Sequence, residues 1–455
     1  MLFNSYTFIF FFLPAMLILW WWPGLSRNQR LALLTIGSYV FYGWAEWWYC
    51  LLMLGSTIID YVAGRRLAPD KPHRERLAWL LVSLAANLGL LAVFKYAGLM
   101  ARSVNLVAGW VSGSGPELLE VPDIILPIGI SFYTFQSMSY TIDRYRKRVP
   151  ETESLLEFAA YVAMFPQLIA DQLRAIPTRL TASRVALGLH FFIFGLSKKL
   201  LVADPIARAI DPLLKHWEWL SFGDAWLSMT GYSLQIYFDF SGYSDMAVGL
   251  GLWLGFQLPQ NFDSPYQALG FSDFWRRWHI TLSQWLRDYL YIPMGGNRQG
   301  LPRAAAAILV TMLLGGLWHG PSWTFAAWGL FHGLLLALEH ALHRLKLWSP
   351  PAVLVRLATF IAVVLGWVLF RADSFPMAAH LWWVMVGGTG IAFVPEAQPF
   401  LLVLATLGIT WCWMARNTWD GTASLRPRRA VLLALLFMAC VLVMTRPSPF
   451  LYFRF

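Results

Sequence analysis

The sequence predicts an all-α, polytopic integral membrane protein with about 11 to 13 helices, some of them short or re-entrant, around a central tunnel. Hydrophobic residues make up 58% of the 455 residues, whereas charged residues make up only 13%. Aromatic residues reach 16% and include 25 tryptophans, a residue type that is enriched at membrane interfaces. Because a water-soluble enzyme carries far less apolar material, this composition excludes one.

The expected helices follow from apolar runs, since one crossing of the bilayer takes about 20 apolar residues. The runs lie at 8–22, 31–49, 51–63, 77–97, 124–141, 155–170, 186–203, 225–240, 246–258, 304–318, 323–342, 353–370, 378–394, 400–415 and 430–445. No basic residue precedes the first run, so it is expected to be a retained helix and not a cleaved signal peptide.

Several of these runs are too short to cross a bilayer alone, and others are interrupted. Leu126-Pro127-Ile128-Gly129 and Phe165-Pro166 are examples of such interruptions. Irregular backbone at membrane depth is tolerated only where protein buries it or a cavity adjoins it. The interruptions therefore predict the interior tunnel.

Loop charges predict the orientation of the chain. The loops with Arg65 to Arg76 and with Arg144 to Arg148 are basic, whereas Glu117, Glu120 and Asp123 make another loop acidic. Basic loops face the cytoplasm, so both termini are expected outside it. The net charge of +10 then reflects cytoplasmic loops, and the lipid bilayer, not nucleic acid, is the expected surrounding. Without an internal repeat or linker, residues 1–455 are expected to form a single membrane domain.

Residues 231–323 interrupt the apolar sequence with a polar region. Ionisable groups at membrane depth are costly and usually face a wet interior, so this region predicts the functional site. The residues expected to bind substrate or line the tunnel are Asp239, Tyr243, Asp245, Asn261, Trp275, Arg276, Arg277, Asp288 and Trp318. The alternative for Phe271 to Pro293 is an amphipathic helix that lies along the membrane interface.

His319 is the predicted catalytic base. It ends the apolar run 304–318 and precedes Gly320-Pro321, a pair that stops a helix. Imidazole is suited to proton transfer near neutral pH, so His319 could remove a proton from a hydroxyl that attacks a thioester. The alternative is a packed interfacial histidine bonded to a carbonyl group.

His279 is expected to lie near His319 across the tunnel and to position the thioester or the attacking hydroxyl. Arg276 and Arg277 suit the phosphates and adenine of a coenzyme, because a guanidinium group binds phosphate oxygens in pairs. Asp288 is an alternative partner for one of these arginines.

No metal site is expected. Cys50, Cys412 and Cys440 are isolated from one another in the sequence. His340 and His343, next to Glu339, have a spacing that resembles a metal site, but nearby basic residues favour a cytoplasmic rim. His332 has no assigned role.

Several longer motifs occur together, and the order in which they occur is informative. They are Met1 to Ser5, Tyr237 to Asp245, Asn261-Phe262, Phe274 to His279 with its continuation to Pro293, Gly316 to Gly320, and Phe450 to Phe453. Together they resemble the membrane-bound O-acyltransferase family along the whole chain, and in particular its bacterial branch that acetylates alginate, cellulose or peptidoglycan. This resemblance implies a multi-helix fold in which funnels from both faces meet near the bilayer centre.

The resemblance also implies roles for residues and partners. His319 matches the family's near-invariant histidine, and His279 matches its second active-site position. Acetyl-CoA is the implied cytoplasmic co-substrate, with no bound cofactor. An exported polysaccharide is the implied acceptor, usually reached through a periplasmic acetyltransferase partner protein, which places the chain in a bacterial inner membrane.

One motif departs from the family pattern. Relatives usually have Gly-Pro after Leu168-Ile169-Ala170, where this chain has Asp171-Gln172. Asp171 is expected to reach water or to pair with Arg174, and the altered turn could narrow the acyl tunnel. Three alternatives to O-acetylation stay open: D-alanyl transfer to teichoic acid as in a related branch, polysaccharide export without acyl transfer, and a scaffold for periplasmic partners.

Overall fold

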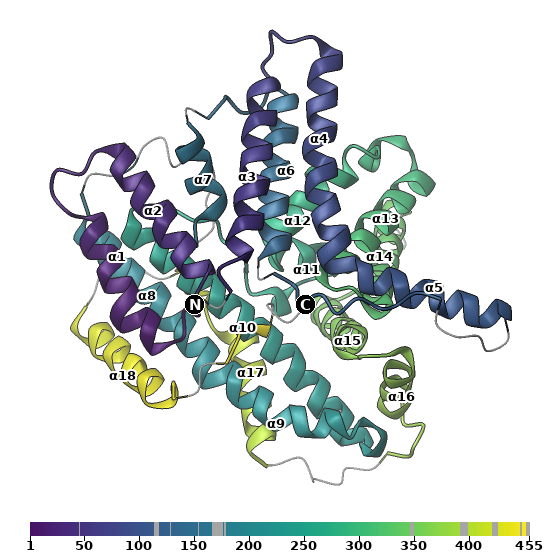
Figure 1. The fold of residues 1–455 in the computed structure, drawn as a ribbon. Coiled ribbons are helices and arrows are strands. Elements are labelled where there is room, and N and C mark those ends of the chain that lie inside the picture. Colours follow the sequence, from purple (N-terminus) through teal and green to yellow (C-terminus); the bar gives the residue numbers. More distant parts are fainter. Residues whose placement is uncertain are drawn as a thin grey trace. The chain divides into compact units, whose positions relative to one another are not determined.

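The computed structural model describes residues 1–44, 46–112, 118–127, 129–152, 154–165, 176, 179–345, 350–391, 399–420, 426–445 and 448–451. Within these ranges every regular element is a helix, as the sequence predicts (Figure 1). Contacts divide the chain into two compact units, Met1–Thr181 with Gly251–Leu258, and Ala182–Leu250 with Pro259–Phe455. The single membrane domain expected over residues 1–455 stays a prediction.

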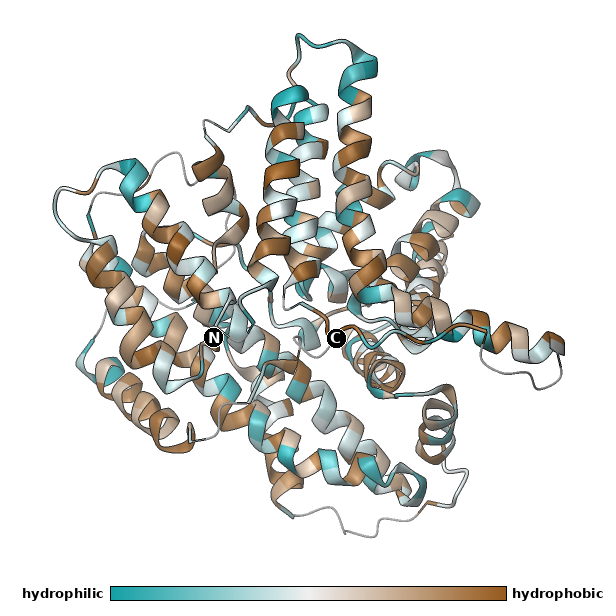
Figure 2. Ribbon diagram, viewed as in Figure 1, coloured by the Kyte–Doolittle hydropathy of each residue, from teal (hydrophilic) through white to brown (hydrophobic). Residues whose placement is uncertain are grey.

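The first unit contains seven of the labelled helices. They are α1 (Leu13–Trp20), α2 (Arg27–Tyr42), α3 (Tyr49–Arg66), α4 (His73–Leu91), α5 (Ala97–Ser112), α6 (Ile130–Tyr145) and α7 (Leu155–Ala163). Helices α3, α4 and α6 run side by side, and hydrophilic residues form the connection between α3 and α4 (Figures 1 and 2). This hydrophilic connection is the predicted basic loop.

A buried carboxylate links helices of this unit. Asp60 of α3 accepts hydrogen bonds from the Ser83 hydroxyl at 2.6 Å and from the Asn87 amide at 2.8 Å, both on α4. Because a buried carboxylate without hydrogen-bond donors would be costly, these bonds hold α3 against α4.

The starts of helices follow local sequence. At α2, the Ser26 hydroxyl accepts from the Gln29 backbone N–H at 3.3 Å, and the Gln29 side chain accepts from the Ser26 N–H at 2.9 Å. This reciprocal pair is a capping box. At α7, the Ser154 hydroxyl accepts from the Glu157 N–H. These caps satisfy N–H groups that have no partner within the helix.

The second unit holds the remaining helices. They are α8 (Ala182–Ser197), α9 (Asp204–Lys215), most of α10 (Phe222–Leu254), α11 (Phe271–Arg277), α12 (Ile280–Leu286), α13 (Leu301–His319), α14 (Trp323–Arg344), α15 (Ala352–Arg371), α16 (Phe375–Met385), α17 (Pro399–Met414) and α18 (Pro427–Val443). The backbones of α8 and α10 touch, because a Cβ at Gly195 would lie only 2.5 Å from the Gly242 carbonyl oxygen. The apolar run 225–240 and most of the run 246–258 lie in one continuous helix, α10.

Five helical stretches of the described residues are long and apolar enough to cross a membrane. They are His73–Val111, Ala182–Lys215, Leu301–His319, Trp323–Arg344 and Ala352–Arg371, and two shorter apolar helices are Thr7–Trp20 and Pro399–Met414. These five stretches are fewer than the apolar runs, because some runs form short helices: the run 378–394 is helical over Phe375–Met385. Their length and composition fit a multi-pass membrane protein.

Some expectations lie outside the described residues. These are the Asp171-Gln172 departure, its ion pair with Arg174, and the acidic residue Glu117. The two predicted orientations of the termini and the central tunnel stay predictions.

Candidate active site

His319 stands at the end of α13, where Gly320-Pro321 stops the helix as the sequence predicts. Two glycines bring α13 and α14 into backbone contact just before this point. A Cβ at Gly316 would lie 2.3 Å from the Phe325 carbonyl oxygen, and a Cβ at Gly329 would lie 2.1 Å from that of Met312. The position of His319 therefore depends on the absence of side chains at both glycines.

The ring of His319 is buried among aromatic side chains and is only 5% exposed. Ring centroids lie 5.1 Å from Trp318, 5.1 Å from Trp328 on α14 and 5.3 Å from Phe370 on α15. We call Trp318, Trp328 and Phe370 the aromatic cluster. Edge-to-face packing of this kind fixes the plane of the imidazole ring.

Gly329→Ala is expected to move His319 and lower activity. The new methyl group cannot occupy the position 2.1 Å from a backbone oxygen, so α13 and α14 must separate. Overpacking costs about 1 to 3 kcal/mol, and a displacement near 1 Å costs about 100-fold in rate. Thermal unfolding and acyl-transfer rate measure the two effects.

Gly89→Ala on α4 is the matched control, because a Cβ there meets nothing within 4 Å. This control should be as stable as the wild type or more stable, since alanine favours helix over glycine. Equal behaviour of the two variants would contradict the close approach of α13 and α14.

His279 lies between α11 and α12 and has a left-handed backbone, with φ 43° and ψ 57°. Non-glycine residues rarely adopt this conformation, and such strain is concentrated at functional sites. A single helix over Phe271 to Pro293, as in the predicted alternative, is therefore wrong, because the chain turns at Trp278 and His279. The location of this segment along the membrane interface stays a prediction. The turn directs His279 into the protein, where it is 3% exposed.

The His279 ring contacts three other segments of the second unit. Its Nδ1 lies 3.2 Å from the Asn261 side-chain oxygen. Ring centroids lie 4.7 Å from Phe240 on α10 and 6.1 Å from Trp318 on α13. Burial lowers the pKa of His279 to about 3, so the ring is neutral at neutral pH.

The structure brings the two predicted histidines to one side chain. Trp318 contacts His279 at 6.1 Å and His319 at 5.1 Å between ring centroids. Residues 40 positions apart in the chain thus meet at one indole. This arrangement agrees with the expected proximity, while the role of each histidine stays a prediction.

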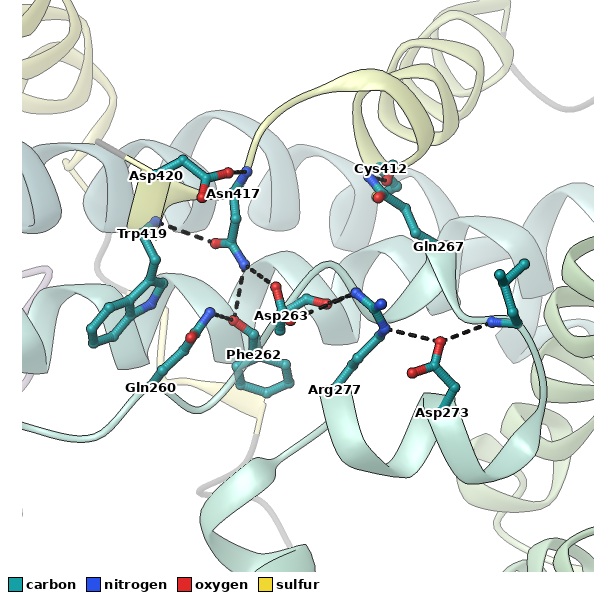
Figure 3. Close-up of polar contacts among 11 residues, drawn as sticks. Gln260, Phe262, Asp263, Gln267, Asp273, Arg277, Cys412, Asn417, Trp419 and Asp420 are labelled. Atoms are coloured by element: carbon teal, nitrogen blue, oxygen red, sulfur yellow. Dashed lines mark hydrogen bonds and ion pairs between the residues drawn. The ribbon is translucent and has the colours of Figure 1, made fainter. Parts of the chain in front are cut away.

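Arg277 is committed to ion pairs and not to an exposed surface. Its guanidinium lies between Asp263 and Asp273 (Figure 3), with N–O distances of 3.6 Å and 3.0 Å. It also donates to the Asp263 carbonyl oxygen at 3.1 Å. Asn417, from the segment after α17, donates to the Phe262 carbonyl oxygen and to the Asp263 carboxylate, both at 3.2 Å. Arg277 therefore braces the loop that precedes α11.

Arg276 and Asp288, the other two charged residues predicted for the site in this segment, have different surroundings from Arg277. Arg276 is exposed. Asp288 pairs with Arg287 at 2.7 Å, not with Arg276 or Arg277 as the alternative prediction had it. A sequence pattern could not choose between these partners, because four arginines lie within 12 residues of Asp288. Of the two arginines expected to bind phosphate, Arg276 is the one exposed to a ligand.

Two acidic residues of α10, Asp239 and Asp245, pair with two lysines. Asp239 lies 2.6 Å from Lys199, and Asp245 lies 2.6 Å from Lys198. Both lysines adjoin the end of α8, within an apolar run. Sequence analysis missed this pairing, although two lysines in an apolar run signal a need for buried carboxylates.

The same acidic region contacts residues 449–451. The Asp239 carboxylate accepts from the Leu451 N–H at 2.8 Å, and the Tyr243 ring lies 5.0 Å from that of Phe450. Lys199 also donates to the Pro449 carbonyl oxygen. Asp239 and Tyr243 thus have structural partners, and direct contact of these residues with substrate stays a prediction.

Trp275 of α11 and Glu339 of α14 connect these two helices. Trp275 contacts Trp328 and His332, with ring centroids 5.7 Å and 5.3 Å away. Glu339 of α14 accepts from the Ser272 N–H at 2.8 Å and so caps α11. The predicted rim location of Glu339 misses this contact, because it joins residues 67 positions apart. No cluster of potential metal ligands is found among the described residues.

Comparisons with known proteins identify the family of this chain. The model of the membrane-bound O-acyltransferase family matches residues 76–377, which include both histidines. The chain is 39% identical to a probable alginate O-acetylase AlgI of Pseudomonas putida over 100% of both chains. It is 36% identical to a peptidoglycan O-acetyltransferase of Helicobacter pylori over 88% of this chain and 83% of that protein.

A third relative is more distant. The teichoic acid D-alanyltransferase of Bacillus subtilis is 26% identical over 58% of this chain and 74% of that protein. The chain therefore belongs to the membrane-bound O-acyltransferase family. It is a multi-pass membrane enzyme that transfers acyl groups to hydroxyl groups. Because the protein is an acyltransferase, the alternative of a polysaccharide exporter without acyl transfer is wrong.

Proposed function

We propose that this protein transfers acetyl groups from cytoplasmic acetyl-CoA across a bacterial inner membrane for O-acetylation of an exported polysaccharide. The observation that carries the proposal is the meeting of His279 and His319 at Trp318 in the buried part of the second unit. The names of the relatives that are 39% and 36% identical support acetyl as the acyl group and a cell-envelope polymer as the acceptor.

His319 acts as the general base in this proposal. It removes the proton from the acceptor hydroxyl as the oxygen forms a bond to the acetyl carbonyl carbon. The carbon–sulfur bond then breaks, and the coenzyme A thiolate takes up the proton, so that an ester and a free thiol are the products. General-base assistance typically contributes about 10² to 10⁴ in rate.

The coenzyme and the acceptor reach this site from opposite sides of the membrane in our proposal. Arg276 is exposed and suits a phosphate group of coenzyme A. The acceptor is a hydroxyl group of the polysaccharide or of a periplasmic acetyltransferase partner that passes acetyl on. Both termini are proposed to be periplasmic, because the basic loops mark the cytoplasmic side.

Purified protein in detergent or liposomes tests the reaction directly. It should release free thiol from acetyl-CoA in the presence of a hydroxyl acceptor. Mass analysis of exported polymer from cells with and without the chain should show an acetyl difference. The proposal would be contradicted if no acceptor led to thiol release and if the acetyl content of the polymer were the same with and without the chain.

D-alanyl transfer is the second candidate, because the Bacillus subtilis relative carries that name. The same mass analysis separates the two chemistries, since D-alanyl and acetyl esters differ in mass and only the former adds an amine. A D-alanyl ester on the polymer would replace acetyl in the proposal and leave the role of His319 unchanged.

A further inference from the structure

We infer that Asn261 is a positioning residue that holds His279 in one tautomer, with the proton on Nδ1 and the lone pair on Nε2. The inference rests on the proposed acyl transfer and deepens it, because it decides what His279 can bind. It is carried by the three hydrogen bonds that meet at one oxygen of Asn261.

The backbone determines which way the Asn261 amide points. Its Oδ1 lies 3.2 Å from the Thr281 backbone nitrogen and 3.0 Å from the Thr281 hydroxyl. A backbone N–H can only donate, so the atom facing it must be the amide oxygen and not the NH₂ group. The Asn261 backbone is also held, since its carbonyl oxygen accepts from the Ile280 N–H at 3.0 Å.

The tautomer of His279 follows from this orientation. The same Oδ1 lies 3.2 Å from His279 Nδ1, and an amide oxygen only accepts. Nδ1 must therefore carry the hydrogen, and in a neutral ring Nε2 then carries the lone pair. Burial favours the neutral ring, because it lowers the pKa of His279 to about 3.

Asn261 also makes the strained backbone of His279 tolerable. The residue before a helix usually caps it with its own side chain. His279 occupies that position for α12 but makes no such side-chain bond. Asn261 supplies the missing acceptor to Thr281 from another segment of the chain. The His279 side chain is thus available for the ring contacts with Phe240 and Trp318.

This tautomer selects the chemistry that His279 recognises. Nε2 with a lone pair accepts a hydrogen bond, so it orients a hydroxyl or thiol hydrogen. It cannot donate to the thioester carbonyl oxygen. Of the two roles expected from the sequence, positioning the acceptor is the one that fits, and His279 then binds the hydrogen of a hydroxyl adjacent to the one that His319 deprotonates.

The groups packed against the ring do not compete for this proton. Phe240 from α10, Trp318 from α13 and Asn261 are not titratable. His319 contacts the same indole and is the other titratable group there. Asp239, which precedes Phe240 in the sequence, is ion-paired with Lys199, and Lys199 also pairs with Asp204. A charge introduced at position 261 is therefore expected to act mainly on His279.

Three variants of the full-length protein test the inference through the pH dependence of acetyl transfer. Asn261→Leu removes the acceptor and should lower kcat by about 100-fold, with the KM for acetyl-CoA within about twofold. Asn261→Asp keeps an acceptor oxygen but adds a negative charge, which raises the pKa of His279. Because the lone pair is lost on protonation, this variant should approach wild-type kcat at pH 8.5 and lose activity at an acidic pH where the wild type retains it.

Thr281→Val is the matched control. It removes another donor to the same Asn261 oxygen but leaves the bond to His279 in place. Its pH profile should match that of the wild type. An Asn261→Asp profile that matches the wild type as well, or the same profile shift in Thr281→Val, would overturn the inference.

A direct measurement needs no active variant. Nitrogen NMR of protein labelled with ¹⁵N-histidine, with the His279 signal identified by its loss in His279→Gln, reports which ring nitrogen is protonated. Protonated Nδ1 supports the inference, and protonated Nε2 overturns it. Failure of the proposed function would appear elsewhere, as wild-type protein that transfers no acetyl group while the NMR result still stands.

Discussion

His319→Ala is expected to lower acetyl transfer by about 10²- to 10⁴-fold, the usual contribution of a general base. A hydroxyl group is almost entirely protonated at neutral pH, so attack on a thioester is slow unless a base removes the proton as the bond forms. His319 is the last residue of α13, and its imidazole ring packs against the aromatic cluster, which restricts the orientation and position of the ring. Thiol release from acetyl-CoA at equal protein concentration measures the loss.

The controls separate lost chemistry from lost packing. His319→Gln keeps a polar side chain of similar length but cannot accept and return the proton near neutral pH, so it should be as inactive as alanine. His343→Ala changes an exposed histidine at the end of α14 and should retain activity. Full activity of either His319 variant, in protein that inserts and elutes normally, would remove His319 from the mechanism.

Lys199→Met is expected to lower the free energy of unfolding by about 3 to 5 kcal/mol, the usual cost of breaking a buried ion pair. The Lys199 side chain is 3% exposed and lies 2.6 Å from Asp239, which is equally buried, and 2.9 Å from Asp204. Without the lysine, two carboxylates face each other without a cation. Loss of Lys199 also removes the bond to the Pro449 carbonyl oxygen, so the chain end should become sensitive to protease.

A double variant tests the cause of this destabilisation. Lys199→Met with Asp239→Leu removes the buried pair as a whole, and should recover a large part of the loss, because apolar replacements of buried pairs are often well tolerated. Lys215→Met at the exposed end of α9 is the control and should change little. Thermal unfolding in detergent measures the stability of each variant. A double variant less stable than Lys199→Met would show that the charge balance is not the cause.

Composition and apolar runs predict the class of this protein well. The runs 304–318, 323–342 and 353–370 correspond to α13, α14 and α15 within a few residues at each end. Hydrophobic length is a local property, so one segment is enough to reveal it. Gly320-Pro321 likewise predicts where α13 ends, because helix termination depends on adjacent residues.

The sequence also identifies the two candidate histidines, whose roles stay predictions, but it does not predict their surroundings. A histidine beside an apolar run signals function from its cost alone. That Asn261 accepts from His279, or that Trp328 and Phe370 contact His319, depends on how distant segments pack. Nothing in the residues around Asn261 indicates which side chain will share its oxygen.

Charged residues show the clearest division between local and distant information. The cost of a charge in an apolar chain predicts that Asp239 and Arg277 need partners, but not which ones. In the structure Arg277 pairs with Asp263 and Asp273, and Asp239 pairs with Lys199. Hydropathy and helix boundaries are sums over neighbouring residues and can be obtained from the sequence. Ion pairs, tautomers and ring contacts depend on distances of a few ångströms between segments up to hundreds of residues apart, and those distances exist only after the helices have packed.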